Sequence, residues 1–563
     1  MPTLSALAPD GSVVDGFVIE GSAVMWTGEN EVDAGIRVEL ELPPLDDPHW
    51  LVPGVFYGTN RVENCLRLYP RYTPGHVDIE RMESDAWSFR ADRCATPAVL
   101  TSGAGLLTIE TSPLGQAGVG FAQRDGRRTI WLDFPFREEP LRYDGSNTPS
   151  PPDVRTYRWQ PGDRVELQFS VLDHGDHAKL LRSVQQPVDD PAWVGVEEAA
   201  ELAAWGLHRW HYKPEPPRLM ETAAFDRDAF GASGDRDHMH VSWVSGVPYA
   251  WALLRHARRV GNAAYAEAAE SVLDHVADNL TPGGTYWARW TREIGWTGGW
   301  HLDPARLHSR TLADAALFML RAGDRWADSA RSNVAVAVRE QREDGALAAA
   351  HRVSDGSAVT YEGSAGMAWI PALVAAGERE AAQRAGAYYA QFEHWYGAPE
   401  DVDLAPTSED GYAALMAFVA LEDWETARRA ADWLLSFRYT YDVAFSERTL
   451  LGRYDFKTRG ADQASPANQH LHAFGLICVP EMLALASATG DDLYRRTTVE
   501  NLACFRQFIA REDGDFDAYR GMAAERYYQT DCFQAKGMLG TLSHAWSIGV
   551  LLLGCEDALE LGL

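Results

Sequence analysis

The chain has 563 residues, of which 46% are hydrophobic and 23% are charged, as in an ordinary soluble globular protein with room for several domains. Its formal net charge of −30 argues against a nucleic-acid partner, because phosphate binding needs a basic surface. No apolar run reaches the roughly 18 residues of a membrane span, and the N-terminus lacks a basic segment followed by an apolar one.

The first part of the chain predicts β structure. Segments 36–42, 98–102, 106–111, 129–134 and 165–171 alternate or are rich in β-branched residues, and Gly, Pro and Asp turns separate them. Many short strands in about 180 residues favour a sandwich of sheets. We therefore expect a β-sandwich domain over residues 1–185.

The residue pattern changes from strand-like to helix-like after a Pro- and Asp-rich stretch, which we interpret as a linker over residues 186–195. From there to residue 563 the sequence predicts twelve helices that alternate in character. One set is amphipathic, as expected of an outer ring, and the other is apolar nearly all round, as expected of an inner ring. The hairpins follow one another roughly 45–75 residues apart, which is typical of helical arrays. Together the two parts predict an N-terminal β-sandwich followed by an (α/α)6 toroid over residues 196–563.

The loops that lead into the six inner helices carry unusual side chains. Those helices are expected to start near Val241, Leu307, Ser364, Ser408, Ala467 and Thr541. In a closed ring all six starts lie on one face, and their dipoles favour polar or anionic ligands there. Trp, His, Arg and carboxylate residues recur together in these loops, which is not expected of solvated loops. We call this face the mouth of the ring.

The mouth supplies the candidate site residues. The catalytic candidates are the carboxylates Glu362, Glu409, Asp410, Asp462 and Glu525. The candidates for substrate binding are Asn60, Arg61, His240, Trp300, His301, Arg310, Tyr361, Trp369, Tyr412, Arg459, Gln469, His470, His472, Tyr527 and His544. Asn60 and Arg61 belong to a polar loop that we expect to reach the mouth from the β domain.

Structural roles compete with these assignments. Acidic residues in a first helical turn, such as Glu409, are common caps that complement the helix dipole. His470 and His472 lie on an apolar segment, where a satisfied core histidine is about as frequent as a ligand contact. The paired histidines at residues 238–240 lack a third metal ligand at a suitable spacing, so we expect no metal and no cofactor. No phosphate loop, dinucleotide fingerprint or serine-hydrolase motif is present in the sequence.

The six cysteines lie far apart without a CxxC pair, and several sit in apolar runs. Such cysteines are typical of reduced, buried thiols, so we expect a cytoplasmic protein. The expected partner is a carbohydrate, with neither a nucleic acid nor a membrane. The sequence leaves the oligomeric state open, a homo-oligomer included.

A leading β-sandwich, six helical hairpins and carboxylate-rich loops together resemble the six-hairpin glycosidases, the broad group that includes glucoamylase-like enzymes. The resemblance covers the whole chain but matches no family motif. It implies a general acid in the loop before the third inner helix, which holds Glu362, and a partner in the loop before the sixth, which holds Asp513 to Glu525. It also implies hydrolysis of an oligosaccharide or glycoside by paired carboxylates.

The residues agree with this expectation. Glycoside hydrolysis needs one carboxylic acid and one carboxylate. Glu362, beside Tyr361 and near Trp369, is the candidate acid, and Glu409, Asp410, Asp462 or Glu525 is the candidate base or nucleophile. Several arginines near the mouth leave an acidic sugar open as the substrate.

Other reactions remain open. A polysaccharide lyase would use Tyr and His with an amide or Arg that neutralises a uronate, and the segment Asn468–His472 with Tyr527 and Tyr528 fits that requirement. A sugar epimerase would use paired histidines, and a phosphorylase or a non-catalytic sugar-binding protein would share the architecture. Function resides in the site rather than in the fold, so the hydrolase is preferred but not established by the architecture.

Overall fold

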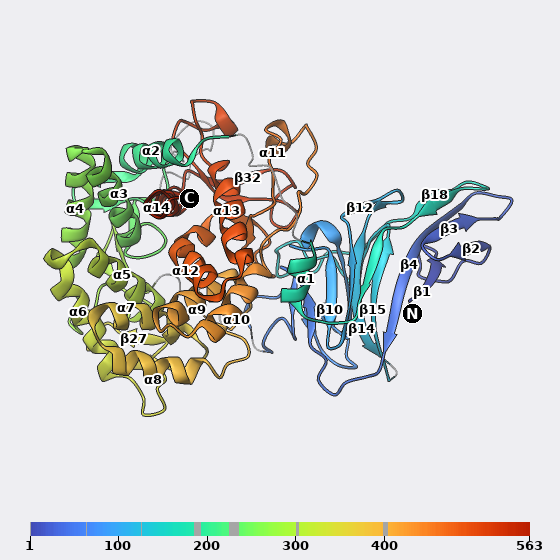
Figure 1. The fold of residues 1–563 in the computed structure, drawn as a ribbon, viewed down its shortest axis with the longest axis horizontal. Coiled ribbons are helices and arrows are strands. Elements are labelled where there is room, and N and C mark those ends of the chain that lie inside the picture. Colours follow the sequence, from blue (N-terminus) through green and yellow to red (C-terminus); the bar gives the residue numbers. More distant parts are fainter. Residues whose placement is uncertain are drawn as a thin grey trace.

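The computed structural model places the sheets and the helices of the chain in two bodies that lie side by side (Figure 1). The N-terminal residues, blue to teal, form the main sheets, and the residues coloured green to red form the ring of helices. The structure describes residues 2–63, 65–124, 126–184, 193–223, 236–299, 303–397 and 404–563.

Two antiparallel sheets dominate the N-terminal body. The larger sheet has the order β1 (Thr3–Leu7), β4 (Val32–Leu42), β15 (Arg127–Phe134), β14 (Gly118–Arg124) and β9 (Ala86–Arg90), with β18 (Tyr157–Trp159) paired to β4. The smaller sheet has the order β20 (Phe169–Leu172), β11 (Ala104–Thr108), β10 (Ala98–Thr101), β5 (Trp50–Val52) and β6 (Phe56–Tyr57).

Alternation along the strands explains why the two sheets face each other. Ile36, Val38 and Leu40 of β4 are buried, and the residues between them are less so, as the two-residue period of a strand requires. Val99 of β10 and Leu106 of β11 belong to the same buried apolar cluster. The inner faces of the two sheets therefore share one core.

Within residues 193–563, the described part of the chain contains twelve α-helices of at least eight residues. Six form an inner set: α3 (Val247–Val260), α5 (Ser309–Ala322), α7 (Trp369–Ala376), α9 (Ser408–Ala420), α12 (Val479–Thr489) and α14 (Ala545–Leu561). Six form an outer set: α2 (Val196–Gly206), α4 (Ala263–Ala277), α6 (Asp324–Arg339), α8 (Arg379–Tyr389), α10 (Trp424–Leu435) and α13 (Asp492–Arg506).

The inner helices close a ring. Each contacts the next in chain order, and α14 contacts α3. Each outer helix packs on an inner one: α4 on α3, α6 on α5, α8 on α7, α10 on α9, α13 on α12, and α2 on α14. Because α2 is the first helix and α14 the last, their packing joins the two ends of the ring. The predicted alternation of amphipathic outer and apolar inner helices is present, since every residue of α14 from Ala545 to Ala558 is buried.

The loops that lead into the inner helices contain short strands that the sequence analysis did not predict. The strands β23 (His238–His240), β24 (Arg289–Thr291) and β25 (Gly295–Thr297) form one small sheet, and β26 (Arg306–His308), β27 (Ala350–Arg352) and β28 (Ala358–Thr360) form a second. A third contains β29 (Asp462–Gln463), β30 (Leu471–His472), β31 (Ala524–Tyr527) and β32 (Leu539–Leu542). Each sheet pairs the loops of successive hairpins.

Because of these strands, the inner helices begin later in the chain than the sequence analysis predicted. The helix α3 begins at Val247 rather than near Val241, and α14 begins at Ala545 rather than near Thr541. The fifth inner helix begins at Val479, after a 3-10 turn over Phe474–Cys478, rather than near Ala467. The predicted starts were therefore early wherever a strand occupies the entry loop. The predicted linker over residues 186–195 falls mostly outside the described residues.

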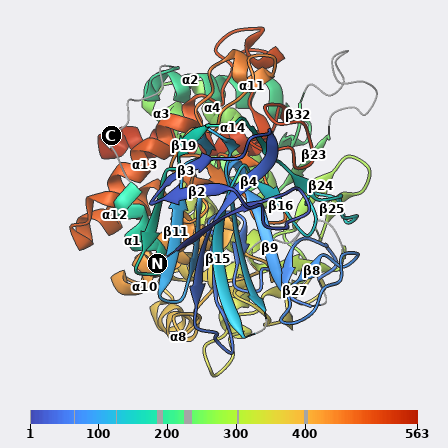
Figure 2. The same ribbon diagram turned by 90° about the vertical axis from the view of Figure 1, so that its right-hand side faces the viewer.

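The N-terminal body rests on the loops of the fifth and sixth hairpins. Figure 2, viewed from its side, shows its strands overlying the ring. The Tyr143 hydroxyl donates to the Ala467 carbonyl (2.7 Å), and the Thr440 amide donates to the Ala95 carbonyl (2.9 Å). Because these loops lead into inner helices, the sheets meet the ring at its mouth. No helix among the described residues is long and apolar enough to cross a membrane.

Candidate functional site

Three aromatic rings meet where the inner helices begin. The ring centroids of Trp243, Phe474 and Trp546 lie 5.5–5.9 Å apart, at steep angles to one another. Both tryptophans keep 7% of their surface exposed. We call these three residues the aromatic centre. Two indoles with partly exposed surface at the mouth suit contact with a sugar ring, which is half apolar.

A buried charge cluster borders the aromatic centre. The Arg310 guanidinium lies 4.6 Å from the Trp243 ring and 4.9 Å from the Phe474 ring, and it pairs with Glu409 in the first turn of α9. One turn along α5, Asp314 lies 3.5 Å from Arg310. Burial raises the pKa of Asp314 to about 6, although Arg310 opposes the shift. Glu409 therefore stands beside the aromatic centre with a buried cation as its partner.

Three histidines near the centre share one local arrangement. The Nδ1 atoms of His240, His472 and His544 each accept the backbone N–H two residues further on, at 3.2, 3.3 and 3.2 Å. This assigns the proton of each neutral ring to Nε2. Burial, together with the charge of Arg310, lowers the pKa of His472 to about 4, against the opposing charges of Asp462 and Glu525. His472 is therefore neutral at pH 7.

The Nε2 atoms of these histidines meet different partners. His240 faces the Thr311 hydroxyl at 3.3 Å, and His472 faces the Ser408 hydroxyl at 3.1 Å. His544 lies 3.4 Å from a carboxylate oxygen of Glu221. Burial alone would raise the pKa of Glu221, but hydrogen bonds from His238 and His544 and the charge of Arg236 hold it well below its usual range.

A fourth histidine lies closer to the N-terminal body. His470 is 4% exposed, and its Nδ1 atom has no hydrogen-bond partner among the described residues. Its ring centroid lies 6.1 Å from that of His472 and 6.4 Å from that of Tyr528. Burial, followed by the charge of Arg526, lowers the pKa of His470 well below its ordinary value. His470 thus offers an unused ring nitrogen in a neutral imidazole.

Glu525 and Arg526 adjoin this histidine on β31. Two nitrogens of Arg526 each lie 3.1 Å from one Glu525 oxygen, and Glu525 keeps 8% of its surface exposed. The strand β31 pairs with β30, which carries His472, so Glu525 lies on the strand beside that of His472. Glu409 follows Ser408, which bonds to His472, so Glu409 and Glu525 are the two predicted carboxylates that lie near His472 and keep some exposed surface.

The other predicted carboxylates have different surroundings. Asp462 is fully buried and bonds to Arg438 through both oxygens (2.7 and 3.1 Å), to the Tyr412 hydroxyl (3.0 Å) and to the Asn501 amide (3.2 Å). Asp410 accepts from the Thr407 hydroxyl at 2.9 Å, and the Asp410 amide donates back to that hydroxyl at 3.1 Å. Asp462 is therefore held in a structural ion pair, and Asp410 belongs to the cap of α9. The Tyr412 hydroxyl is engaged by Asp462, so Tyr412 supports that ion pair rather than a ligand.

Glu362 does not occupy the enclosed setting that the sequence suggested. It is exposed on the loop between β28 and the third inner helix. The hydroxyl of its neighbour Tyr361 donates to the Glu340 carbonyl (2.6 Å) at the end of α6, an outer helix. Trp369 is fully buried in the core of the ring, so neither aromatic residue encloses Glu362.

Several predicted binding residues hold loops in place. The Asn60 amide donates to the Pro70 carbonyl (2.9 Å), and Arg61 donates to the Tyr69 carbonyl (3.0 Å), so both are buried within the N-terminal body instead of reaching the mouth. Arg459 pairs with Glu500 at 3.2 Å. We expected Asn60 and Arg61 to reach the mouth, and for these two residues the expectation was wrong.

The side chains of two further predicted residues bond to other parts of the protein. Gln469 accepts from Arg93 of the N-terminal body at 2.7 Å. The Tyr527 ring stacks on Phe508 with centroids 3.7 Å apart, and its hydroxyl donates to the Phe508 carbonyl (2.8 Å). Trp300 and His301, which the sequence analysis also proposed, lie outside the described residues.

Sequence reasoning missed Trp243, Phe474 and Trp546. A usable signal was present, because each follows a histidine by two or three residues at the entry to an inner helix: His240 and Trp243, His472 and Phe474, His544 and Trp546. It also missed Glu221 and Asp314, whose roles depend on partners that are distant in sequence.

No family model matches the chain, and no curated protein matches it. Among solved structures, it resembles a D-mannose isomerase (13% identity, TM-score 0.46, covering 67% of this chain and 100% of that one). It also resembles a polysaccharide lyase (11%, 0.46, 100% and 92%) and the family 76 α-mannanase of Bacteroides thetaiotaomicron (9%, 0.42, 66% and 96%). These are carbohydrate-active enzymes, as the resemblance to six-hairpin glycosidases led us to expect. At these scores the likeness selects neither a reaction nor a substrate for this chain.

Proposed function

We propose that this protein, a β-sandwich joined to an (α/α)6 barrel, is a glycoside hydrolase whose two working carboxylates are Glu409 and Glu525. The observation that carries the proposal is their placement. Glu409 on α9 follows Ser408, which bonds to His472, and Glu525 lies on β31, which pairs with the strand of His472. Each carboxylate keeps 8% of its surface exposed. The other predicted carboxylates are a buried ion pair, a helix cap and an exposed loop residue.

The surroundings suit bond cleavage between sugars. The indoles of Trp243 and Trp546 each keep 7% of their surface exposed, and an indole is a surface on which a sugar ring can pack. The buried Arg310 favours the ionised form of Glu409, as a base or nucleophile requires. Glycoside hydrolysis needs a second carboxyl group, and Glu525 is our candidate for it.

The test is a screen of aryl glycosides and oligosaccharides for reducing-end release by the full-length protein. We expect turnover of at least one substrate and a loss of about 10²–10⁴-fold in Glu409→Gln and Glu525→Gln, as for removal of an acid or base. If a confirmed substrate is cleaved at full rate by both variants, the assignment is wrong.

A second candidate function is elimination from a uronate-containing saccharide. One observation favours it, namely the neutral His470 with an unused Nδ1 atom beside Tyr528 and Arg526. A neutral imidazole can remove a proton next to a carboxylate, and an arginine can neutralise that carboxylate. An unsaturated product, detected by its ultraviolet absorbance, together with inactivity of His470→Ala, would replace hydrolysis with this reaction.

A further inference from the structure

One arginine of the N-terminal body lies beside the last entry loop of the ring and forms no ion pair with any residue that the structure describes. Arg67 lies in the loop between β6 and β7 (Arg71–Tyr72), and its guanidinium is 5.1 Å from the ring of Phe533, which precedes β32 in the sixth hairpin. Among the described residues, no carboxylate lies within ion-pair distance of Arg67. Its guanidinium bonds to the Tyr143 hydroxyl, so the described residues give it a neutral partner but no carboxylate.

Contacts within the N-terminal body and between the two bodies hold this arginine in place. The Leu68 amide donates to the Asn147 side chain at 3.0 Å, and the Phe533 amide donates to the Asp144 carbonyl at 2.9 Å. Tyr143, next to Asp144, bonds to the Ala467 carbonyl just before the segment that carries His470. Loops around residues 67, 144, 468 and 533 therefore meet at one place.

The buried residues Asn60 and Arg61 acquire a role here. The Tyr69 hydroxyl donates to the Asn60 carbonyl (2.9 Å), and Arg61 donates to the Tyr69 carbonyl (3.0 Å). Tyr69 follows Arg67 by two residues, so these bonds shape the loop that presents it. The N-terminal body thus contacts the mouth through Arg67 rather than through Asn60 or Arg61 themselves.

The described charged groups near Arg67 are paired with other residues. Arg526 is neutralised by Glu525, and Asp531 is engaged by Arg90 and Arg93. His470 is neutral, because burial and the charges of Arg526 and Arg67 oppose its protonation. The place therefore combines an arginine that forms no ion pair with a described residue and an unused ring nitrogen on a side chain that is only 4% exposed.

We infer that Arg67 and His470 form a subsite, built from both bodies, that binds a carboxylate-bearing sugar of the substrate. A guanidinium fork matches a planar carboxylate with two parallel hydrogen bonds. The Nδ1 atom of His470 can exchange a hydrogen bond with a neighbouring sugar hydroxyl in either tautomer. This inference rests on the proposed action on carbohydrates and names the substrate class as uronate-containing.

The test compares binding of uronic-acid oligosaccharides with binding of the same oligosaccharides after reduction of their carboxyl groups. Titration calorimetry on the full-length protein needs no turnover. We expect the acidic form to bind at least tenfold more tightly, and Arg67→Gln to lose most of that preference. Arg67→Lys should keep part of it, because the charge remains but the fork is lost.

The matched control is Arg158→Gln, which removes the same charge from β18, at the far end of the N-terminal body from the ring (Figure 1). It should bind like the parent. Equal binding of both oligosaccharides by the parent, or an undiminished preference in a folded Arg67→Gln, overturns the inference. Should Arg67→Gln fail to fold, Arg67→Lys decides. An unchanged ratio of the affinities for the acidic and the reduced oligosaccharide in that variant counts against paired hydrogen bonds from the guanidinium.

The outcome is separable from that of the proposed hydrolysis. Cleavage of neutral glycosides that depends on Glu409 but not on Arg67 would leave the hydrolase standing and remove the subsite. Selective binding of uronates without hydrolysis would leave the subsite standing and remove the hydrolase. A sulfated neutral oligosaccharide that binds as tightly as the uronate would show a general anion site and overturn the carboxylate assignment.

Discussion

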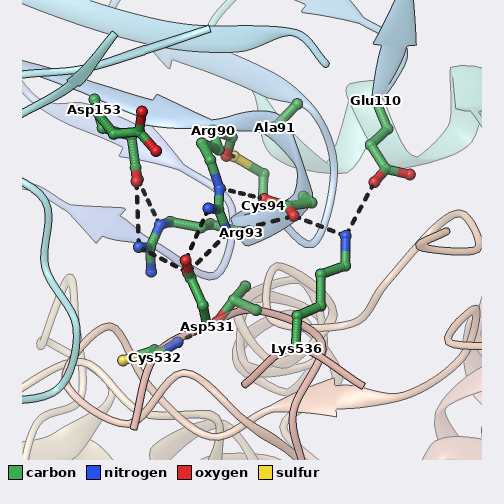
Figure 3. Close-up of polar contacts among 12 residues, drawn as sticks. Arg90, Ala91, Arg93, Cys94, Glu110, Asp153, Asp531, Cys532 and Lys536 are labelled. Carbon is green, nitrogen blue, oxygen red and sulfur yellow. Dashed lines mark hydrogen bonds and ion pairs between the residues drawn. The ribbon is translucent and has the colours of Figure 1, made fainter. Parts of the chain in front are cut away.

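Arg90 of the N-terminal body and Asp531 of the last entry loop form a two-bond ion pair, with nitrogen–oxygen distances of 3.0 and 2.8 Å. Figure 3 shows that Asp531 also faces Arg93, while Lys536 of the same loop reaches toward Glu110 and the residues around Arg90. Lys536 bonds to Asp92 at 2.8 Å. Because this loop links β31 and β32, the N-terminal body fixes the segment that follows Glu525.

We predict that Asp531→Asn loosens this loop. Arg90 retains Asp92 and Arg93 retains Glu138, so neither arginine is left without a carboxylate. Since Asp531 is one-third exposed, the expected cost is modest, about 1–2 kcal/mol. Calorimetry should show a lower Tm, and substrate affinity should fall with it.

The control for Asp531→Asn is Asp517→Asn. That residue forms a more exposed ion pair with Arg453, and exposed pairs contribute about 0–1 kcal/mol. Its Tm should stay close to that of the parent. Equal losses of Tm in the two variants would show that the ion pair between the bodies stabilises the protein no more than an exposed pair does.

The second prediction separates catalysis from stability at Glu409. Glu409→Gln should abolish most turnover, by about 10²–10⁴-fold, because an acid or base group is lost. It should also lower the Tm, because Arg310 stays buried with only Asp314 nearby. Rates per folded molecule and calorimetry on the same preparation measure both effects.

Glu481→Gln is the matched control for Glu409→Gln. Both carboxylates keep 10% of their side chain exposed, and both pair with an arginine of α5, in this case Arg321. Glu481 lies in the first turn of α12, but its partner Arg321 is in the last turn of α5, at the other end of that helix from Arg310. It should lose stability but keep its turnover, and a comparable loss of rate would count against a catalytic role for Glu409.

Much of the architecture could be predicted because it depends on local periodicity. Outer helices show one apolar stripe, and inner helices such as α14 are apolar all round, and both patterns are visible in the sequence. The entry strands could not be predicted in this way. β23 has only the three residues His238–His240, too few for a period, and its pairing with β24 depends on a loop about fifty residues away.

The candidate site was only partly predictable for a related reason. Glu409, His472 and Glu525 were identified because polar residues at an inner-helix entry lie at the mouth. Asp462 shared that position, yet its role is decided by Arg438 on the preceding loop and Asn501 on an outer helix. Spacing along the chain reveals which loop a residue occupies but not which residue pairs with it.

The third prediction therefore concerns Asp462 as a structural residue. Asp462→Asn leaves the buried guanidinium of Arg438 without its counter-charge, and breaking a buried pair costs about 3–5 kcal/mol. We expect a large fall in Tm or a loss of soluble protein. The double variant Asp462→Asn with Arg438→Met removes both charges and should recover part of the stability. No recovery would show that the hydrogen bonds from Tyr412 and Asn501 matter more than the charge.

The last prediction uses His177, at the start of α1 (His177–Val184). Burial lowers the pKa of His177 to about 4, against a usual value of 6.5, although the charge of Asp176 and a hydrogen bond with the Asp432 backbone oppose the shift. The unfolded chain therefore binds a proton near pH 6.5 that the folded chain does not bind until about pH 4. Stability from this group is present above pH 6.5 and is lost as the pH falls toward 4.

At pH 5 the loss should reach about 2 kcal/mol, since each pKa unit corresponds to about 1.4 kcal/mol. His177→Leu cannot take up that proton, so the fall in stability between pH 7 and pH 5 should be smaller in the variant by about this amount. Urea unfolding at the two pH values measures it, and His76→Gln, at an exposed position, controls for the removal of a histidine. Other buried groups, such as Asp314, titrate in the same window, but they do so equally in parent and variant and cancel in the difference. If both proteins lose the same stability between pH 7 and pH 5, His177 is already charged in the folded state and the burial argument fails.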